Sequence, residues 1–323
     1  MRLFVTEFIT GGGIANDPLP ESLKQEGQLM LQAVLNDCLK MKNVQLVTTR
    51  DARIKIDVDE VEVYVVENAI DYMQQLALIA NQCDATWVIA PESEGVLEAI
   101  IANLTNEKIR LVNCDTESIR ITSDKLMCAL HLLEFDIPTV KNLSQEEVSS
   151  YEGPVMIKDR YGVGCEGLKR CAKGKDALQY IDNFSQWVVQ PYVEGKHLSL
   201  SILFSSSQVT VMSLNEQIFS GDDQPKLTAC LVNAYSINTK IQRLADKIQQ
   251  ALPGLKGYVG IDVIEREGEY YVVDINPRLT SSYVGLSAVL DDNPAQLCFN
   301  SALDEKIPHD IKKNDHVIEV RVA

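Results

Sequence analysis

The sequence lacks the cysteine and histidine spacing of a zinc site or a disulfide framework. Its eight cysteines (38, 83, 114, 128, 165, 171, 230 and 298) include no CxxC pair, and its four histidines include no HExxH motif. Soft-ligand metal centres and disulfide scaffolds are therefore disfavoured. We expect all eight cysteines to be reduced, buried thiols.

Basic residues and long apolar runs are also scarce. There are 30 Lys and Arg against 46 Asp and Glu, which gives a net charge of −16 and argues against nucleic acid or an anionic membrane as partner. No apolar run approaches the roughly 18 residues of a membrane span, and the first apolar run meets Glu7 too early for a signal peptide. We expect a cytoplasmic protein that acts on small molecules. Its oligomeric state is left open, a homo-oligomer included.

The 323 residues exceed what one hydrophobic core usually supports, so two or three subdomains are expected. Short apolar runs alternate with amphipathic stretches in the first third, which is typical of a parallel α/β layer. Its expected strands are 3–9, 44–48, 61–66, 86–90 and 109–113, and its expected helices are 21–41, 71–83 and 95–104.

The remainder has an α+β pattern that favours antiparallel sheets. We expect a helix over 124–135 capped by Ser123, a second helix over 239–252, and a tail from Asp304 whose segment 316–322 could pair with either sheet or with a partner. The expected strands are 155–158, 186–193, 198–205, 208–214, 229–235, 258–265 and 270–275.

A hairpin near the C-terminal end carries the clearest chemical signal. Its turn is expected near Glu267 and Gly268, which brings Asp262 within about a residue of Asp274 across the ladder. Asn276 shares a face with Asp274 because strand side chains alternate. Two carboxylates and an amide oxygen would then meet at one point.

Oxygen ligands on a rigid hairpin suit Mg²⁺, which binds one or two carboxylates together with nucleotide phosphates. Arg278 follows, where a cation could support a transferring phosphoryl group. The alternative is that these residues are solvated turn residues. The metal interpretation is favoured, because Asp262 and Asp274 lie within apolar runs, where a carboxylate without a partner costs several kcal/mol.

Gly162, Gly164 and Gly167 form a GxGxxG string between two expected strands. A Rossmann or P-loop site would require a following helix, so a flap over phosphates is the better interpretation, with ordinary turns as the alternative. Lys158 ends a buried-looking strand and needs an anion, which a nucleotide phosphate would supply.

Two further segments are weak signals by themselves. Lys125 lies near the start of its helix, where exposure is the default. After the strand that contains Gln190, residues 190–194 could pair backbone amides with a purine edge, or could simply end an edge strand at Pro191.

In this order, over about residues 110–290, these motifs resemble the ATP-grasp superfamily. The resemblance implies an α/β N-terminal domain (1–115), followed by α+β ATP-grasp subdomains at 116–192, with the glycine flap, and 193–323, with the metal hairpin. Antiparallel sheets would enclose a nucleotide cleft.

The resemblance also implies that Lys125 and Lys158 contact ATP phosphates and that Gln190 with Val193 or Glu194 holds adenine. Mg²⁺, or Mn²⁺, would be bound by Asp262, Asp274 and Asn276. Two departures leave details open: His197 stands where many members place a ribose-binding glutamate, and Asp274 stands where glutamate is commoner.

The expected reaction is phosphorylation of a carboxylate by ATP, followed by attack of an amine on the acyl phosphate, with Lys158 and Arg278 as the catalytic cations. Residues 214–217, 90–92 and 6–8 are similar to the branch that joins glutamate to tyramine in methanofuran biosynthesis. Two alternatives stay open: an enzyme that forms a thioester or carboxylates its substrate, and a sensor that binds ATP without turnover.

Overall fold

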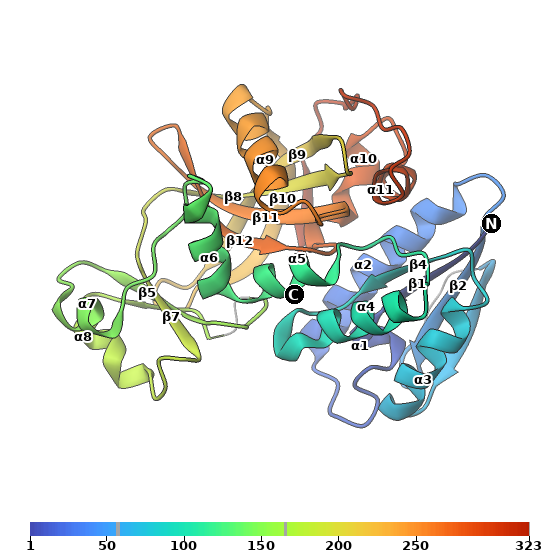
Figure 1. The fold of residues 1–323 in the computed structure, drawn as a ribbon, viewed down its shortest axis with the longest axis horizontal. Helices are drawn as coiled ribbons and strands as arrows, with labels where there is room; N and C mark the ends of the chain where they lie inside the picture. Colours follow the sequence, from blue (N-terminus) through green and yellow to red (C-terminus); the bar gives the residue numbers. More distant parts are fainter. Residues whose placement is uncertain (56–58, 165–166, 323) are drawn as a thin grey trace.

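The computed structural model describes residues 1–55, 59–164 and 167–322. Cys165 and Glu166 of the glycine-rich segment therefore lie outside the described residues. Three sheets lie side by side along the longest axis of the molecule, with the four-stranded sheet on the right in Figure 1, the six-stranded sheet in the centre and the three-stranded sheet on the left. A cleft opens between the central and left sheets.

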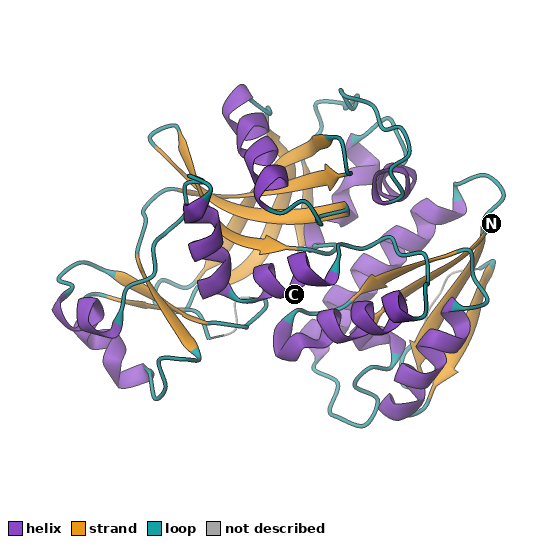
Figure 2. Ribbon diagram, in the orientation of Figure 1, coloured by secondary structure: helices purple, strands orange, loops and turns teal. Residues whose placement is uncertain are grey.

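The N-terminal layer is a parallel sheet in the order β3-β2-β1-β4 with helices on both faces (Figure 2). Leu3 and Val5 pack on the side of α2, whereas Phe4 packs on the side of α3 and α4, as the alternation of a strand requires. The elements are β1 (Arg2–Glu7), α1 (Phe8–Gly11), α2 (Glu21–Leu39), β2 (Gln45–Asp51), β3 (Val61–Val66), α3 (Ala69–Ala80), β4 (Ala85–Ile89), η1 (Ser93–Gly95) and α4 (Val96–Asn106).

Two expectations for this layer were wrong in detail. The strand expected over 3–9 ends at Glu7, whose carboxylate accepts the amide N–H groups of Ile9 and Thr10 and so starts α1. Residues 109–113 form only a single bridge to β4, because the Asn113 side chain bonds both the N–H and the C=O of Val88 at 3.0 and 2.8 Å in place of the backbone.

The expected cap at Ser123 was also wrong. Ser123 is the last residue of a helix that the sequence pattern did not indicate, α5 (Thr116–Ser123), and its hydroxyl donates to the carbonyl of Ile119. The cap of α6 (Lys125–Glu134) is Asp124, whose carboxylate accepts the amides of Leu126 and Met127. A serine hydroxyl and an aspartate are both good caps, so local sequence did not separate them.

The central sheet is antiparallel in the order β12-β11-β8-β9-β10-β13. Alternate residues of β8, such as Leu200 and Ile202, pack with Ile241 and Ile248 of α9 on one face. The opposite face of β8 presents His197 and Ser199 to the cleft. The elements are β8 (Lys196–Phe204), β9 (Val209–Ser220), β10 (Lys226–Tyr235), α9 (Thr239–Ala251), β11 (Gly257–Arg266), β12 (Glu269–Asn276), η3 (Ser281–Gly285), α10 (Leu286–Val289), α11 (Pro294–Ala302) and β13 (Ile318–Arg321).

The small sheet is antiparallel in the order β6-β5-β7, with its own core around Val155, Ile157 and Val189. Its elements are α7 (Gln145–Ser150), β5 (Val155–Asp159), β6 (Lys169–Cys171), α8 (Gly174–Ala177), η2 (Leu178–Tyr180) and β7 (Trp187–Pro191). The glycine-rich segment joins β5 to β6, so the expected position between two strands is confirmed.

The tail joins the central sheet, since β13 pairs with β10. Of the seven cysteines within the described residues, six are buried, Cys83 is partly buried, and all are free thiols. None of the helices in the described ranges is long and apolar enough to cross a bilayer. The predicted fold class is confirmed by these three sheets and their connections.

The packing of α9 gives a stability prediction. Ile248 is fully buried on this helix, whereas Gln250, two residues later, is exposed. Ile248→Ala should lower the free energy of unfolding by about 2–5 kcal/mol, because it leaves a cavity under the central sheet. Gln250→Ala should change it by less than about 0.5 kcal/mol. Urea unfolding followed by circular dichroism measures both; equal losses would contradict this packing.

Candidate active site

The β11–β12 hairpin brings two carboxylates directly opposite each other. Asp262 and Asp274 are partners in the antiparallel register, followed by an irregularity between Asp262 and Val263. The turn is formed by Glu267 and Gly268, whose φ values of 55° and 79° are typical of a two-residue hairpin loop. Asp262 and Asp274 therefore meet without an intervening residue.

The electrostatics of the pair fit a divalent cation. Burial, and then the charge of Asp274, raise the pKa of Asp262 to about 7, although a hydrogen bond from Asn276 and the nearby lysines 158 and 125 lower it. Gln217 Nε2 donates to Asp262 Oδ1 at 3.0 Å. Two adjacent carboxylates and one amide oxygen match the hard ligand set of Mg²⁺ better than that of a soft metal.

Lys125 connects the hairpin to the glycine-rich segment. Its ammonium donates to the carbonyl of Gly162 at 2.7 Å and pairs with Asp274 at 3.2 Å. Burial alone would lower the pKa of Lys125, but the attraction of Asp274 outweighs it and the pKa is raised, so the side chain stays charged. Helix α6 thus presents a cation at its first residue, next to the carboxylate pair.

The base of the glycine-rich segment is clamped to α6. Arg160 makes two bonds to the Asp124 carboxylate, at 2.7 and 2.6 Å, and its carbonyl accepts the backbone N–H of Lys125 at 3.0 Å. Gly164 has a φ of 63° with open space around it. Such a conformation favours glycine and brings the backbone close to whatever occupies the cleft.

Lys158 and His197 lie on facing walls of the cleft. Lys158 is on β5 and His197 on β8, and both line the same cavity. Burial and the charge of Lys158 lower the pKa of His197, so the imidazole is neutral at neutral pH. The His197 ring packs on Phe219 with 5.1 Å between centroids.

The segment after β7 borders the cavity, although the Gln190 side chain is used structurally. Gln190 Nε2 donates to the carbonyl of Val140 at 2.9 Å, which holds the strand end in place. Gln190 and Val193 line the cavity. Glu194 is exposed and is not among the described residues that line it.

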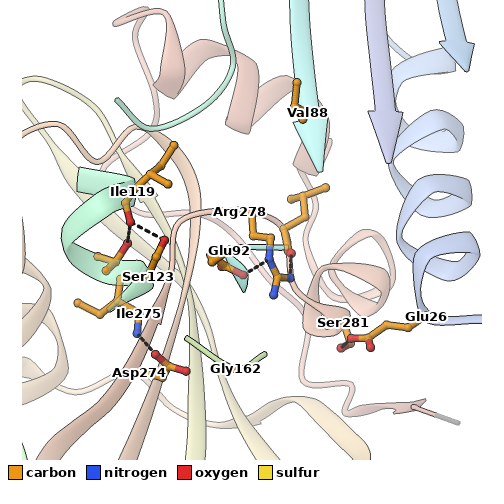
Figure 3. Close-up of polar contacts among 12 residues, drawn as sticks. Glu26, Val88, Glu92, Ile119, Ser123, Gly162, Asp274, Ile275, Arg278 and Ser281 are labelled. Carbon is orange, nitrogen blue, oxygen red and sulfur yellow. Dashed lines mark hydrogen bonds and ion pairs between the residues drawn. The ribbon is translucent and has the colours of Figure 1, made fainter. Parts of the chain in front are cut away.

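Arg278, just beyond β12, forms a desolvated ion pair with the N-terminal layer. Its Nε donates to Glu92 Oε2 at 2.8 Å and its Nη1 donates to the carbonyl of Leu279 at 3.0 Å (Figure 3). Only 13% of the Arg278 side chain and 5% of the Glu92 side chain are exposed, so each charge depends on the other. Burial would lower the pKa of Arg278, but Glu92 and then Glu26 raise it.

Hydroxyl groups form a neutral floor beside Arg278. The buried Tyr258 hydroxyl bonds Thr280 at 2.8 Å and Ser282 at 3.0 Å. Gly260 allows this approach, since a Cβ there would lie 2.5 Å from the Thr280 methyl carbon. Thr280 and Ser282 line the cavity, so this part of the wall is polar but uncharged.

These groups surround one cavity of about 390 Å³. Gly167 and Glu194 are the predicted residues that are absent from its described lining. Three contributors were given no role by the sequence pattern: Glu26, Glu92 and Gln217. The residues with which these three side chains interact lie far away in the chain. Glu92 and Gln217 belong to the 90–92 and 214–217 motifs, which were noted for their resemblance only, and Glu26 belongs to no motif. The predicted residues that line the cavity are Lys125, Lys158, Gly162, Gly164, Gln190, Val193, His197, Asp262, Asp274, Asn276 and Arg278.

Comparison with known proteins identifies the class. An ATP-grasp domain model matches residues 122–282, and a pre ATP-grasp domain model matches residues 44–119. The chain is 26% identical over 302 residues to tyramine–L-glutamate ligase of Methanocaldococcus fervens. The aligned region covers 92% of this chain and 94% of the relative.

Solved structures agree on the fold. A putative ATP-grasp superfamily protein from Archaeoglobus fulgidus superposes with a TM-score of 0.71 at 20% identity, covering 94% of this chain and 90% of the other. N5-carboxyaminoimidazole synthetase from Staphylococcus aureus, complexed with ADP, superposes with a TM-score of 0.73 at 17% identity, covering 98% and 81%.

The chain belongs to the ATP-grasp superfamily. The predicted ATP-dependent ligase class is thereby confirmed, and the resemblance extends over nearly the whole length of the tyramine–L-glutamate ligase.

The carboxylate pair predicts a specific loss in one variant. Asp274→Asn should abolish turnover and the rise in melting temperature that Mg²⁺-ADP gives the wild type, because ligand binding to the folded state stabilises it. The melting temperature of the metal-free protein should stay within a few degrees. Asp222→Asn, which removes the same charge from another cavity-lining residue, should keep the Mg²⁺-ADP response. Thermal shift measures both, and an intact response in Asp274→Asn would refute the metal assignment.

Lys158 is predicted to bind a nucleotide phosphate. Lys158→Ala should weaken ATP binding about 10- to 150-fold, since a charge-assisted hydrogen bond contributes about 1.5–3 kcal/mol. Lys169→Ala is the control: this lysine of the same small sheet stacks on Tyr180 and is not among the described residues that line the cavity. Calorimetric titration with ATP tests the pair, and unchanged affinity in Lys158→Ala would rule out the role.

Proposed function

We propose that the protein is an ATP-dependent carboxylate–amine ligase that acts through an acyl phosphate, with glutamate as carboxylate and tyramine or tyrosine as amine. The γ-phosphoryl group of ATP passes to a carboxylate oxygen, which releases ADP. The amine nitrogen then attacks the acyl carbon, the C–N bond forms, and phosphate leaves with the oxygen.

The observation that carries this proposal is the distribution of charge around the cavity. Lys125 lies beside the Asp262 and Asp274 carboxylates, and Lys158 lines the same cavity from the small sheet, an arrangement that suits polyphosphate together with a cation. Mg²⁺ bound by Asp262, Asp274 and Asn276 would supply charge neutralisation at the phosphates.

The protein's own residues do the remaining work by position. Lys158 and Arg278 stabilise negative charge on the transferring group and on the carboxylate that receives it. Gly162 and Gly164 border the cavity, where they limit the access of water that would hydrolyse the acyl phosphate. The neutral His197 ring adds no charge near the ribose position.

Two observations weigh against the alternatives. A carboxylating enzyme must hold bicarbonate, but this anion has no cationic group to pair with Glu26, which lines the cavity together with Arg278. A sensor without turnover needs no set of paired carboxylates, amide and lysines around the phosphates. Glutamate and tyramine are named because the tyramine–L-glutamate ligase of M. fervens matches over 94% of its own length.

The test is ADP formation from ATP and Mg²⁺ across a matrix of amino acids and aromatic amines, with and without glutamate. Glutamate with tyramine or tyrosine should stimulate ADP release and give a new amide by mass spectrometry. Release with other pairs would keep the ligase and discard these substrates. No release with any pair would refute the ligase proposal in favour of the sensor.

A further inference from the structure

One residue of the N-terminal layer reaches the cavity. Among the described residues that line it, Glu26 is the one contributed by residues 1–115. It lies in the second turn of α2, and the neighbouring lining residues Ser281 and Ser282 come from η3. Glu26 therefore faces the cavity at the contact between the N-terminal layer and the central domain.

The carboxylate of Glu26 is fixed in position. Ser281 Oγ donates to Glu26 Oε1 at 2.8 Å (Figure 3). The next residue, Gly27, allows α2 to press against the buried Glu7, since a Cβ there would lie 2.5 Å from Glu7 Oε2. A carboxylate has about four lone-pair positions, so the bond to Ser281 leaves acceptor capacity toward the cavity.

Charge at this end of the cavity is mixed. Arg278 offers a buried cation that Glu92 offsets, and Glu26 lines the same cavity as Arg278. A simple anion would be repelled by Glu26, whereas a simple cation would be repelled by Arg278. A molecule with a carboxylate and an ammonium on neighbouring atoms suits both.

The ammonium that Glu26 would hold is not the attacking amine. A nearby carboxylate stabilises the protonated form of an ammonium and raises its pKa, which would oppose the loss of the proton that attack requires. A fixed carboxylate therefore suits an ammonium that keeps its proton throughout the reaction. The α-ammonium of an amino acid that is activated at a carboxylate is such a group.

We propose that Glu26 binds the α-ammonium of the carboxylate substrate and makes the enzyme selective for an α-amino acid over the corresponding plain carboxylic acid. This rests on the proposed ligase function. Glu26 is thus a specificity-determining residue that the N-terminal layer supplies, with Arg278 facing a carboxylate of the same molecule.

A structural explanation of Glu26 is that it only joins α2 to η3 through Ser281. The two roles are separable by substitution. Glu26→Gln keeps an oxygen that accepts from Ser281 but removes the charge. Ser281→Ala removes the bond but keeps the charge, and Glu21→Gln removes an equal charge from an exposed residue of the same helix.

The test compares glutamate with glutarate, which has both carboxylates and lacks the amino group. The ratio of kcat/KM for glutamate to that for glutarate should be about 10- to 150-fold in the wild type, the range of one charge-assisted hydrogen bond. It should fall to within about threefold of unity in Glu26→Gln. Glu21→Gln should keep it, and Ser281→Ala should keep most of it because the charge of Glu26 remains. The KM for ATP should be unchanged in Glu26→Gln and Glu21→Gln.

Three results would overturn the inference. The first is equal use of glutamate and glutarate by the wild type, and the second is an unchanged glutamate-to-glutarate ratio in Glu26→Gln. The third is that Glu26→Gln raises only the KM of the amine. Failure of the proposed function is different, since the wild type would then form no amide from glutamate and any amine.

Discussion

Two like charges held face to face are the constraint on which the rest of this structure depends. Asp262 and Asp274 occupy directly opposed positions on β11 and β12, where like charges destabilise a sheet. The protein offsets the repulsion with Lys125, the Asn276 amide and the Gln217 amide. The fold thus keeps a locally unfavourable arrangement, which the proposed binding of a cation would relieve.

Each sheet contributes different residues to the cavity around this carboxylate pair. The central sheet supplies the carboxylates and the amides, and α6 brings Lys125 to them from the connection between domains. The small sheet places Lys158 on the facing wall, and the Arg160–Asp124 pair ties it to the start of α6. The N-terminal layer contributes Glu26 and Glu92 beside Arg278. The cavity is therefore built from all three bodies.

Short-range patterns explain how much of this could be predicted from the sequence. The β11–β12 hairpin was predictable because alternating apolar residues flank a Glu267-Gly268 turn, and the register then follows from the length of the loop. The flap position between two strands followed from the same kind of pattern. The pairs Arg278–Glu92 and Ser281–Glu26 span 186 and 255 positions, so no local signal contains them. The failed strand at 109–113 has a related cause, since the Asn113 side chain replaces backbone bonds that the apolar pattern alone would suggest.

The Glu92–Arg278 pair also limits how this chain can be recombined with its relatives. A chimera that joined a foreign α/β layer to the rest of the chain would leave the guanidinium buried against whatever residue replaced Glu92. Without a carboxylate there, an uncompensated charge would cost about 3–5 kcal/mol. The two halves are therefore exchangeable only as a matched set, and their histories under recombination should be shared, since the hydrophobic core also combines residues of both.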